Sequence, residues 1–265
     1  MNKEELKPTP EPARLSVDLN SDLGESYGSF VIGCDEEILK YVSSANIACG
    51  WHGGDPVVME KTVKTAKKNG IAIGAHPSYP DLMGFGRRKM LLSADEAKAY
   101  TKYQLGAFWA FAKSNNMEVA HIKPHGAMYN DAGADYNMAR AIAEATFEVN
   151  PHIAFMALAG SQMVKAADDV GLRVISEVFA DRAYEEDGSL VARSKPGAII
   201  HDEIICMERI IKMLKYGTVT AISGKEINVV ADSICVHGDN PQALLFVKKI
   251  TESLKSEGFT IAPCR

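Results

Sequence analysis

Cysteine is scarce in this chain and follows no pairing pattern. The cysteines form an odd, dispersed set without a CxxC motif: Cys34, Cys49, Cys206, Cys235 and Cys264. Disulfide frameworks and zinc ribbons need paired cysteines, so this distribution argues against both. We expect all of these residues to be reduced thiols.

Long apolar runs and an excess of basic residues are also missing. No apolar run approaches the roughly 18 residues that a membrane-spanning helix requires. The formal net charge of -5 at pH 7 leaves no basic surface for nucleic acid. We therefore expect neither a membrane nor a nucleic acid as a partner.

The N-terminal segment MNKEELKPTPEPAR lacks the apolar stretch of a signal peptide. It is charged and rich in proline, which predicts a disordered tail over residues 1–13 and a cytoplasmic location. With 46% hydrophobic residues in a length of 265, the chain can bury one sizeable core. We expect residues 14–265 to form a single catalytic domain.

The known nucleotide-binding loops are absent as well. No GxxxxGK[ST] motif occurs, and no GxG follows a strand as it does in a dinucleotide-binding fold. Any chemistry that uses ATP would therefore need help from another polypeptide.

What the chain does have is one pattern that recurs in six stretches. In each, a short apolar, strand-like run ends in Gly, His, Asp, Glu, Asn or Lys, and a helix-like segment follows. The stretches are VDLNSDLGE, ANIACGWHGGD, IAIGAHPSYPD, VAHIKPHGAMYN, VISEVFADR and SICVHGDNP. A flat sheet would give the same alternation, but six polar strand ends favour a closed (β/α) barrel of seven or eight units. Such barrels carry their chemistry at the carboxyl ends of the strands, so the pattern indicates an enzyme.

The helix signals between these runs are clear. Asp55 to Asn69 has an N-cap followed by proline, and Ser93 to Asn116 opens with a capping-box pattern. The polar segment Asp181 to Pro196 is long enough to be a lid over the site.

The first strand carries a group of acids. Asp18, Asn20 and Asp22 share one face because side chains alternate along a strand, and Glu25 follows just beyond. Burial raises the pKa of a carboxyl group and suits it to general acid or base catalysis. Asn20 and Asp22 could instead cap a turn, with Glu25 in solvent, but three polar groups in register favour function.

Histidines end the next two strands. His52 follows Asn46 among glycines that let the backbone approach a small ligand, and His76 ends the motif GAHP. With Asp18 or Asp22 these histidines could hold a divalent metal, although no HExxH or similar local spacing supports it.

The motif HIKPHG places His121 and Lys123 on one strand face, with His125 in the loop beyond and Tyr129 close behind. A lysine inside a barrel loses hydration unless it meets an anion, so Lys123 predicts a nearby carboxylate or phosphate. That anion could belong to a substrate or to the protein. The candidate acids are Asp18, Asp22 and Glu177.

Arginines and one more histidine complete the candidate set. Arg87 in GFGRR and Arg182 in ADRAY carry guanidinium groups suited to a carboxylate or phosphate, whereas the neighbouring Arg88 fits a surface role better. His237 and Asp239 end the last polar strand.

In order along the chain, the motifs resemble those of the LamB/YcsF family, whose members are the A subunits of 5-oxoprolinase. They are DLNSDLGE, NIACGWHGGDP, GAHPSYPD, KPHGAMYN, EVFADRAY with GSLVARSKPGA, and SICVHGDNPQA. The resemblance runs without gaps from about Leu15 to Pro263. It implies a distorted TIM-like barrel of the glycoside hydrolase/deacetylase type. It also implies ATP-dependent opening of 5-oxo-L-proline to L-glutamate, together with partner subunits B and C.

This implied chemistry accounts for the missing ATP loop, because the partners would phosphorylate the amide oxygen and this chain would add water to the activated ring. We assign Asp22 or Glu25 as the base and His52 or His76 as the acid. The full set of expected catalytic residues is Asp18, Asp22, Glu25, His52, His76 and Lys123. The expected substrate-binding residues are Asn20, Asn46, Arg87, His125, Tyr129, Glu177, Arg182, His237 and Asp239.

Two other functions are compatible with these residues. One is a metal-dependent deacetylase or amidohydrolase that acts on a small amide or an acetylated sugar, with a divalent metal as cofactor. The other is a lactam-binding scaffold protein without catalytic activity.

Overall fold

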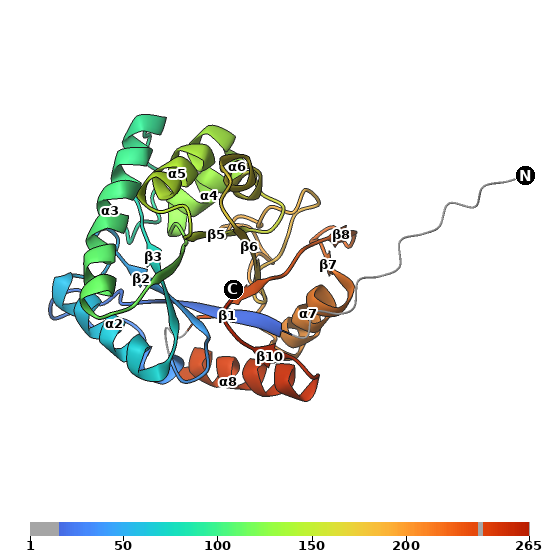
Figure 1. Ribbon diagram of the computed structural model, residues 1–265. Helices are drawn as coiled ribbons and strands as arrows, with labels where there is room; N and C mark the ends of the chain where they lie inside the picture. Colours follow the sequence, from blue (N-terminus) through green and yellow to red (C-terminus); the bar gives the residue numbers. More distant parts are fainter. Residues whose placement is uncertain (1–15, 238–240, 265) are drawn as a thin grey trace, which may run out of the picture.

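The strands of this protein close into a parallel barrel inside a ring of helices (Figure 1). The computed structural model describes residues 16–237 and 241–264. Within these residues the barrel order is β1-β2-β3-β4-β5-β6-β9, and β9 pairs with β1 to close it. The barrel strands are β1 (Ser16–Leu23), β2 (Ser44–Ala48), β3 (Ala72–His76), β4 (Val119–Ile122), β5 (Ala154–Leu158), β6 (Val174–Phe179) and β9 (Ser233–Cys235).

The helices follow the predicted alternation and begin at the predicted caps. Asp55 accepts from the backbone N–H groups of Val57 and Val58, and Ser93 and Glu96 form the capping box. The helices are α1 (Asp35–Ile38), α2 (Pro56–Asn69), α3 (Ala94–Ser114), α4 (Gly126–Ala134), α5 (Tyr136–Val149), α6 (Gln162–Val170), α7 (Glu203–Tyr216) and α8 (Pro241–Ser256). The predicted barrel is therefore confirmed.

Three features differ from the sequence-based expectation. Helix α4 forms where the sequence suggests a polar loop. The sequence GAMYNDAGA suggests a loop because it has two glycines and little amphipathic pattern. The hairpin β7 (Thr218–Thr220) and β8 (Glu226–Asn228) interrupts the alternation before β9. Strand β10 (Thr260–Ile261) pairs with the start of β1, outside the closed ring.

The faces of β1 show how the sequence divides the barrel. Val17 and Leu19 are buried in the main apolar core, whereas Asp18 and Asn20 alternate with them and are buried among polar groups. The inside of the barrel is thus polar along this strand, and these polar groups continue to the carboxyl end of the strand, where Asp22 lies.

Other expectations have simple outcomes. The predicted tail over residues 1–13 lies outside the described residues. None of the cysteines, all of which lie within the described ranges, forms a disulfide. No helix in the described part of the chain is both long and apolar enough to cross a membrane.

Candidate functional site

A cavity of about 800 Å³ opens at the carboxyl ends of the barrel strands, where the sequence predicts the site. Its volume lies in the range of small-molecule sites. Side chains from β1, β3, the ends of β4 and β9, and the segment 182–193 line it. Those with charged or polar groups include Asp22, His76, Arg87, Lys123, His125, Tyr129, Arg182, Arg193 and His237.

A buried lysine joins two carboxylates at the base of this cavity. The Nζ atom of Lys123 lies 3.0 Å from Asp22 Oδ1 and 2.7 Å from Glu177 Oε1. Tyr129 donates its hydroxyl proton to Glu177 Oε2 at 2.6 Å. Of the two sources considered for the anion beside Lys123, the structure places protein carboxylates there.

This pairing sets the charge states of the groups. Burial alone would raise the pKa of Asp22, but His76 and Lys123 beside it hold that pKa well below its usual range. Burial would lower the pKa of Lys123, but Asp22 and the other acidic groups around it keep that pKa well above its ordinary value. Asp22 is therefore an ionised carboxylate that faces the cavity next to a cation.

Polar side chains beneath the cavity support this pair. Asn46 donates to Asn20 Oδ1 at 2.7 Å and to Asp22 Oδ1 at 2.8 Å, and Lys123 donates to Asn20 Oδ1 at 3.2 Å. His121 Nε2 lies 2.6 Å from Asn46 Oδ1, and burial lowers the pKa of His121 to about 3, so the ring is neutral and donates. Asn20 and Asn46, expected to bind substrate, do not line the cavity and instead orient Asp22 and Lys123.

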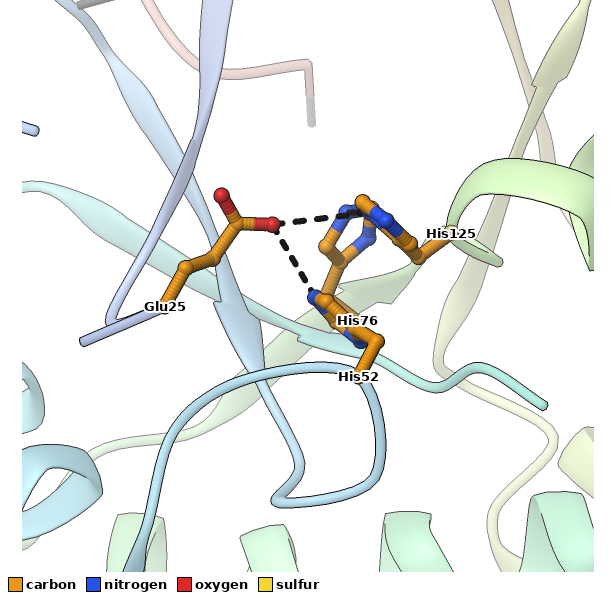
Figure 2. Close-up of side chains that lie close together, drawn as sticks. All are labelled: Glu25, His52, His76 and His125. Carbon is orange, nitrogen blue, oxygen red and sulfur yellow. Dashed lines mark hydrogen bonds and ion pairs between the residues drawn. The ribbon is translucent and has the colours of Figure 1, made fainter. Parts of the chain in front are cut away.

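Beside Asp22 lies a cluster of one glutamate and three imidazoles, Glu25, His52, His76 and His125 (Figure 2). Glu25 Oε1 is 3.0 Å from His52 Nε2 and 3.5 Å from His125 Nδ1. His76 Nε2 is 2.9 Å from His125 Nδ1 and 3.3 Å from Asp22 Oδ2. Burial holds the pKa of His52 and of His125 well below the usual value, so both rings are neutral at pH 7.

The loop that contains Phe85 and Gly86 fixes the cluster from above. Phe85 O accepts from His125 Nε2 at 3.0 Å, and Gly86 O accepts from the backbone N–H of Ala127 at 2.8 Å. Gly86 has φ 63°, and a Cβ atom there would lie only 2.8 Å from the Cβ of His52. Only glycine allows the loop to pack this closely on the histidines.

Arginines also line the cavity. Arg182 is buried, donates through Nη2 to Val191 O at 2.8 Å, and has an Nε atom without a hydrogen-bond partner. Arg87 lies over the Phe85 ring, and Arg193 comes from the segment expected to form a lid. These guanidinium groups suit an anionic ligand.

Asp18 does not lie at this site. It precedes Asp22 by four residues on the same strand, which corresponds to about 13 Å. Ser43, Ser44 and Ser233 donate to its carboxylate, and it lines a different hollow at the amino ends of the strands. The structure therefore places Asp18 away from the cavity that Asp22 lines, because residues on one strand face can lie at opposite ends of the barrel.

The burial of Asp18 predicts a pH dependence of stability. Burial raises the pKa of this carboxyl from 3.8, so the folded state holds a proton that the unfolded chain has lost. Stability contributed by this proton is lost as the pH rises, and Asp18→Asn removes the titration. We expect the free energy of unfolding of Asp18→Asn, relative to the unmodified protein, to increase from about pH 4 to about pH 7. Urea unfolding measures this difference, and a constant difference across this pH range would contradict the prediction.

The remaining candidates have mixed positions. His237 lines the cavity with a buried Nε2 atom that has no hydrogen-bond partner, whereas Asp239 lies outside the described residues. Arg88 forms an ion pair with Asp81 away from the cavity, as its surface assignment predicts. The lid candidate, residues 181–196, contributes Asp187 to Leu190 to the cavity wall.

Sequence reasoning missed some residues of the site. Cys235 accepts from Lys123 Nζ at 3.3 Å, and its position two residues before His237 is the only local signal for it. Phe85 acts through its backbone oxygen, which no side-chain pattern indicates. Arg193 lies within the motif GSLVARSKPGA and could have been found there.

Comparison with known proteins adds independent information. The sequence model of the LamB/YcsF family matches residues 17–265. A protein from Alkaliphilus metalliredigens, named as the A subunit of 5-oxoprolinase, is 56% identical over 91% of this chain and 94% of its own length. A protein of the same name from Campylobacter jejuni is 58% identical over 93% of this chain and 97% of its own length. The crystal structure of a lactam utilization protein from Thermus thermophilus, 44% identical, matches with a TM-score of 0.88 and covers 93% of this chain and 99% of that one.

Proposed function

This chain belongs to the LamB/YcsF family, and on that premise we propose that it opens the lactam ring of 5-oxo-L-proline by hydrolysis to give L-glutamate. In this proposal it is the A subunit of an ATP-dependent enzyme with partner subunits B and C. Its relatives are named as A subunits of 5-oxoprolinase and as a lactam utilization protein, and these names support a role in lactam metabolism.

The observation that carries the proposal is the combination of charges around one cavity. An ionised carboxylate, Asp22, and an imidazole, His76, lie 3.3 Å apart in the cavity wall, and arginines line the same cavity. Hydrolysis of a lactam needs a group that takes a proton from water and one that returns a proton to the ring nitrogen. It also needs cations for the carboxylate of 5-oxoproline and for a phosphoryl group on the activated ring.

The geometry narrows the roles that the sequence leaves open. Asp22 and His76 line the cavity, whereas Glu25 and His52 lie behind them. We therefore assign Asp22, with His76, to take the proton from water as it adds to the ring carbon. The same pair returns the proton to the nitrogen as the C–N bond breaks. This leaves an acyl phosphate, which a second water molecule hydrolyses to glutamate and phosphate.

Lys123 is not the group that we assign to bind the carboxylate or phosphate of the substrate. Its charge is already matched by Asp22 and Glu177, so it keeps Asp22 ionised and in place. Arg182, whose Nε atom has no hydrogen-bond partner, is the better group for the substrate carboxylate or phosphate, with Arg193 close to it. Arg87 lines the cavity nearer the histidine cluster. The cavity exceeds the size of 5-oxoproline, which leaves room for the phosphoryl group.

The test is glutamate release from 5-oxo-L-proline and ATP, by the purified chain alone and in a mixture with purified subunits B and C. We expect glutamate only in the complete mixture, because the chain has no ATP-binding motif. Release by the chain alone without ATP would contradict the proposal. So would the absence of glutamate from a complete mixture, which would favour the metal-dependent amidohydrolase instead.

A further inference from the structure

Backbone carbonyl groups fix the protonation of two histidines in the cluster. His76 Nδ1 lies 2.7 Å from Lys123 O, and His125 Nε2 lies 3.0 Å from Phe85 O. A carbonyl oxygen only accepts hydrogen bonds, so each of these nitrogens must carry a proton. The other nitrogen of each ring, His76 Nε2 and His125 Nδ1, is therefore the one that faces the rest of the cluster.

These two nitrogens face each other. His76 Nε2 and His125 Nδ1 are only 2.9 Å apart (Figure 2). Glu25 Oε1 lies 3.5 Å from His125 Nδ1, and Asp22 Oδ2 lies 3.3 Å from His76 Nε2. Two imidazole nitrogens and two carboxylate oxygens thus converge on one place, where a shared proton or a metal ion can bridge them.

The spacing of these atoms suits a metal ion. Two ligand atoms that each bind zinc at about 2.1 Å in tetrahedral geometry lie about 3.4 Å apart. The ligand atoms of Glu25, His52, His76 and His125 all lie within 4.8 Å of one another. Carbonyl groups that hold the second ring nitrogen of a histidine are the usual support for metal-binding imidazoles.

We propose that a divalent transition metal ion binds between His76 Nε2, His125 Nδ1 and the carboxylate of Glu25. Two imidazoles and a carboxylate suit zinc and its neighbours better than magnesium or calcium, which prefer oxygen ligands only. When bound, such an ion lowers the pKa of a water molecule in its open position.

His52 has a different task in this site. Its ring is stacked on that of His125, with centroids 3.7 Å apart and planes 4° from parallel. Parallel rings at this separation do not direct in-plane lone pairs at one point. His52 Nε2 lies 3.0 Å from Glu25 Oε1 and therefore orients the glutamate as a positioning residue.

A second group of ligand atoms, from Asp22, Cys235 and His237, is a poorer site. The ammonium group of Lys123 is 3.0 Å from Asp22 Oδ1 and 3.3 Å from Cys235 Sγ, so a cation already occupies this position. A second cation there would be repelled.

The test is titration of the metal-stripped full chain with Zn²⁺ by calorimetry, and with Co²⁺ by absorption spectroscopy, in the absence of 5-oxoproline and ATP. We expect one ion per chain and an absorption band of tetrahedral Co²⁺. His76→Gln, His125→Gln and Glu25→Gln should each weaken binding by about 100-fold or more, and His52→Gln by about 10- to 100-fold. Thermal unfolding identifies any variant that fails to fold, and the three ligand variants serve as replicates of one another.

The controls are His237→Gln, in the second group, and the exposed His152→Gln. Both should bind as the unmodified chain does. Unchanged binding by the folded His76→Gln/His125→Gln double variant would overturn the proposal, as would weaker binding caused by His237→Gln alone. No metal binding by the unmodified chain would also overturn the proposal. The short distance between His76 and His125 would then be explained by a proton that the two rings share. Because no lactam is present, the result is independent of the proposed reaction.

Discussion

Asp22→Asn should lower the rate of 5-oxoproline ring opening by about 100-fold or more, which is the usual scale of a lost general base. The asparagine side chain keeps the shape of the aspartate but cannot take a proton from water. The substitution also removes the negative charge that lies 3.0 Å from Lys123 Nζ at the base of the cavity. The measurement is kcat and KM for glutamate release in the complete mixture with ATP and the partner subunits.

The matched control for this variant is Asp18→Asn, the same substitution on the same strand. Asp18 is bound by serine hydroxyls at the other end of the barrel, so its rate should stay within about 3-fold of the unmodified chain. A loss in kcat with little change in KM would indicate a role in the chemical step. If Asp22→Asn opens the ring at full rate, the base is another group, and Glu25 becomes the first candidate.

Lys123→Met should lower the free energy of unfolding by about 3–5 kcal/mol, because it removes one partner of a buried ion network. The lysine side chain is only 4% exposed, and its loss leaves Asp22 and Glu177 as carboxylates without their cation. Urea unfolding at neutral pH measures the change. Lys98→Met is the control, since Lys98 pairs with Glu144 and Glu148 on the helix surface, where ion pairs contribute about 0–1 kcal/mol.

The loss of unfolding free energy in Lys123→Met should become smaller as the pH falls. Lys123 is one of the groups that hold the pKa of Asp22 well below its ordinary value. A lowered folded-state pKa contributes stability above the ordinary value of 3.8, and this stability is lost as the pH falls through the folded-state pKa. The difference between the two proteins should therefore shrink below about pH 4. A deficit that grows on acidification, or a variant as stable as Lys98→Met, would show that the network contributes little.

Most of the fold could be predicted because local signals agree with the tertiary structure. Single residues such as Asp55 and Ser93 mark where the helices begin, and the structure confirms both helix starts. The apolar part of strand β1 ends at Leu19, but the strand continues to Leu23. The residues Asn20, Ser21 and Asp22 interrupt the apolar run, and polarity within a strand reads as a loop.

The candidate site could be predicted in its location and residue types but not in its pairings. All strand-end polar groups meet at one end of a parallel barrel, so the positions of Asp22, His76 and Lys123 follow without any knowledge of distances. Which acid lies beside which base depends on register between strands. The contact of His76 with His125 joins residues 49 positions apart, and it depends on the backbone path of both loops.

The pairing of β10 with β1 has a practical consequence for work with the partner subunits. Ser16 lies opposite Thr260 in this pairing, so both ends of the described chain meet at the amino ends of the strands. Asp22 lies at the far end of β1, about 20 Å from Ser16. The described residues nearest the two ends thus lie on the face opposite the cavity, so a surface tether placed near Ser16 or Thr260 leaves the cavity open to solution.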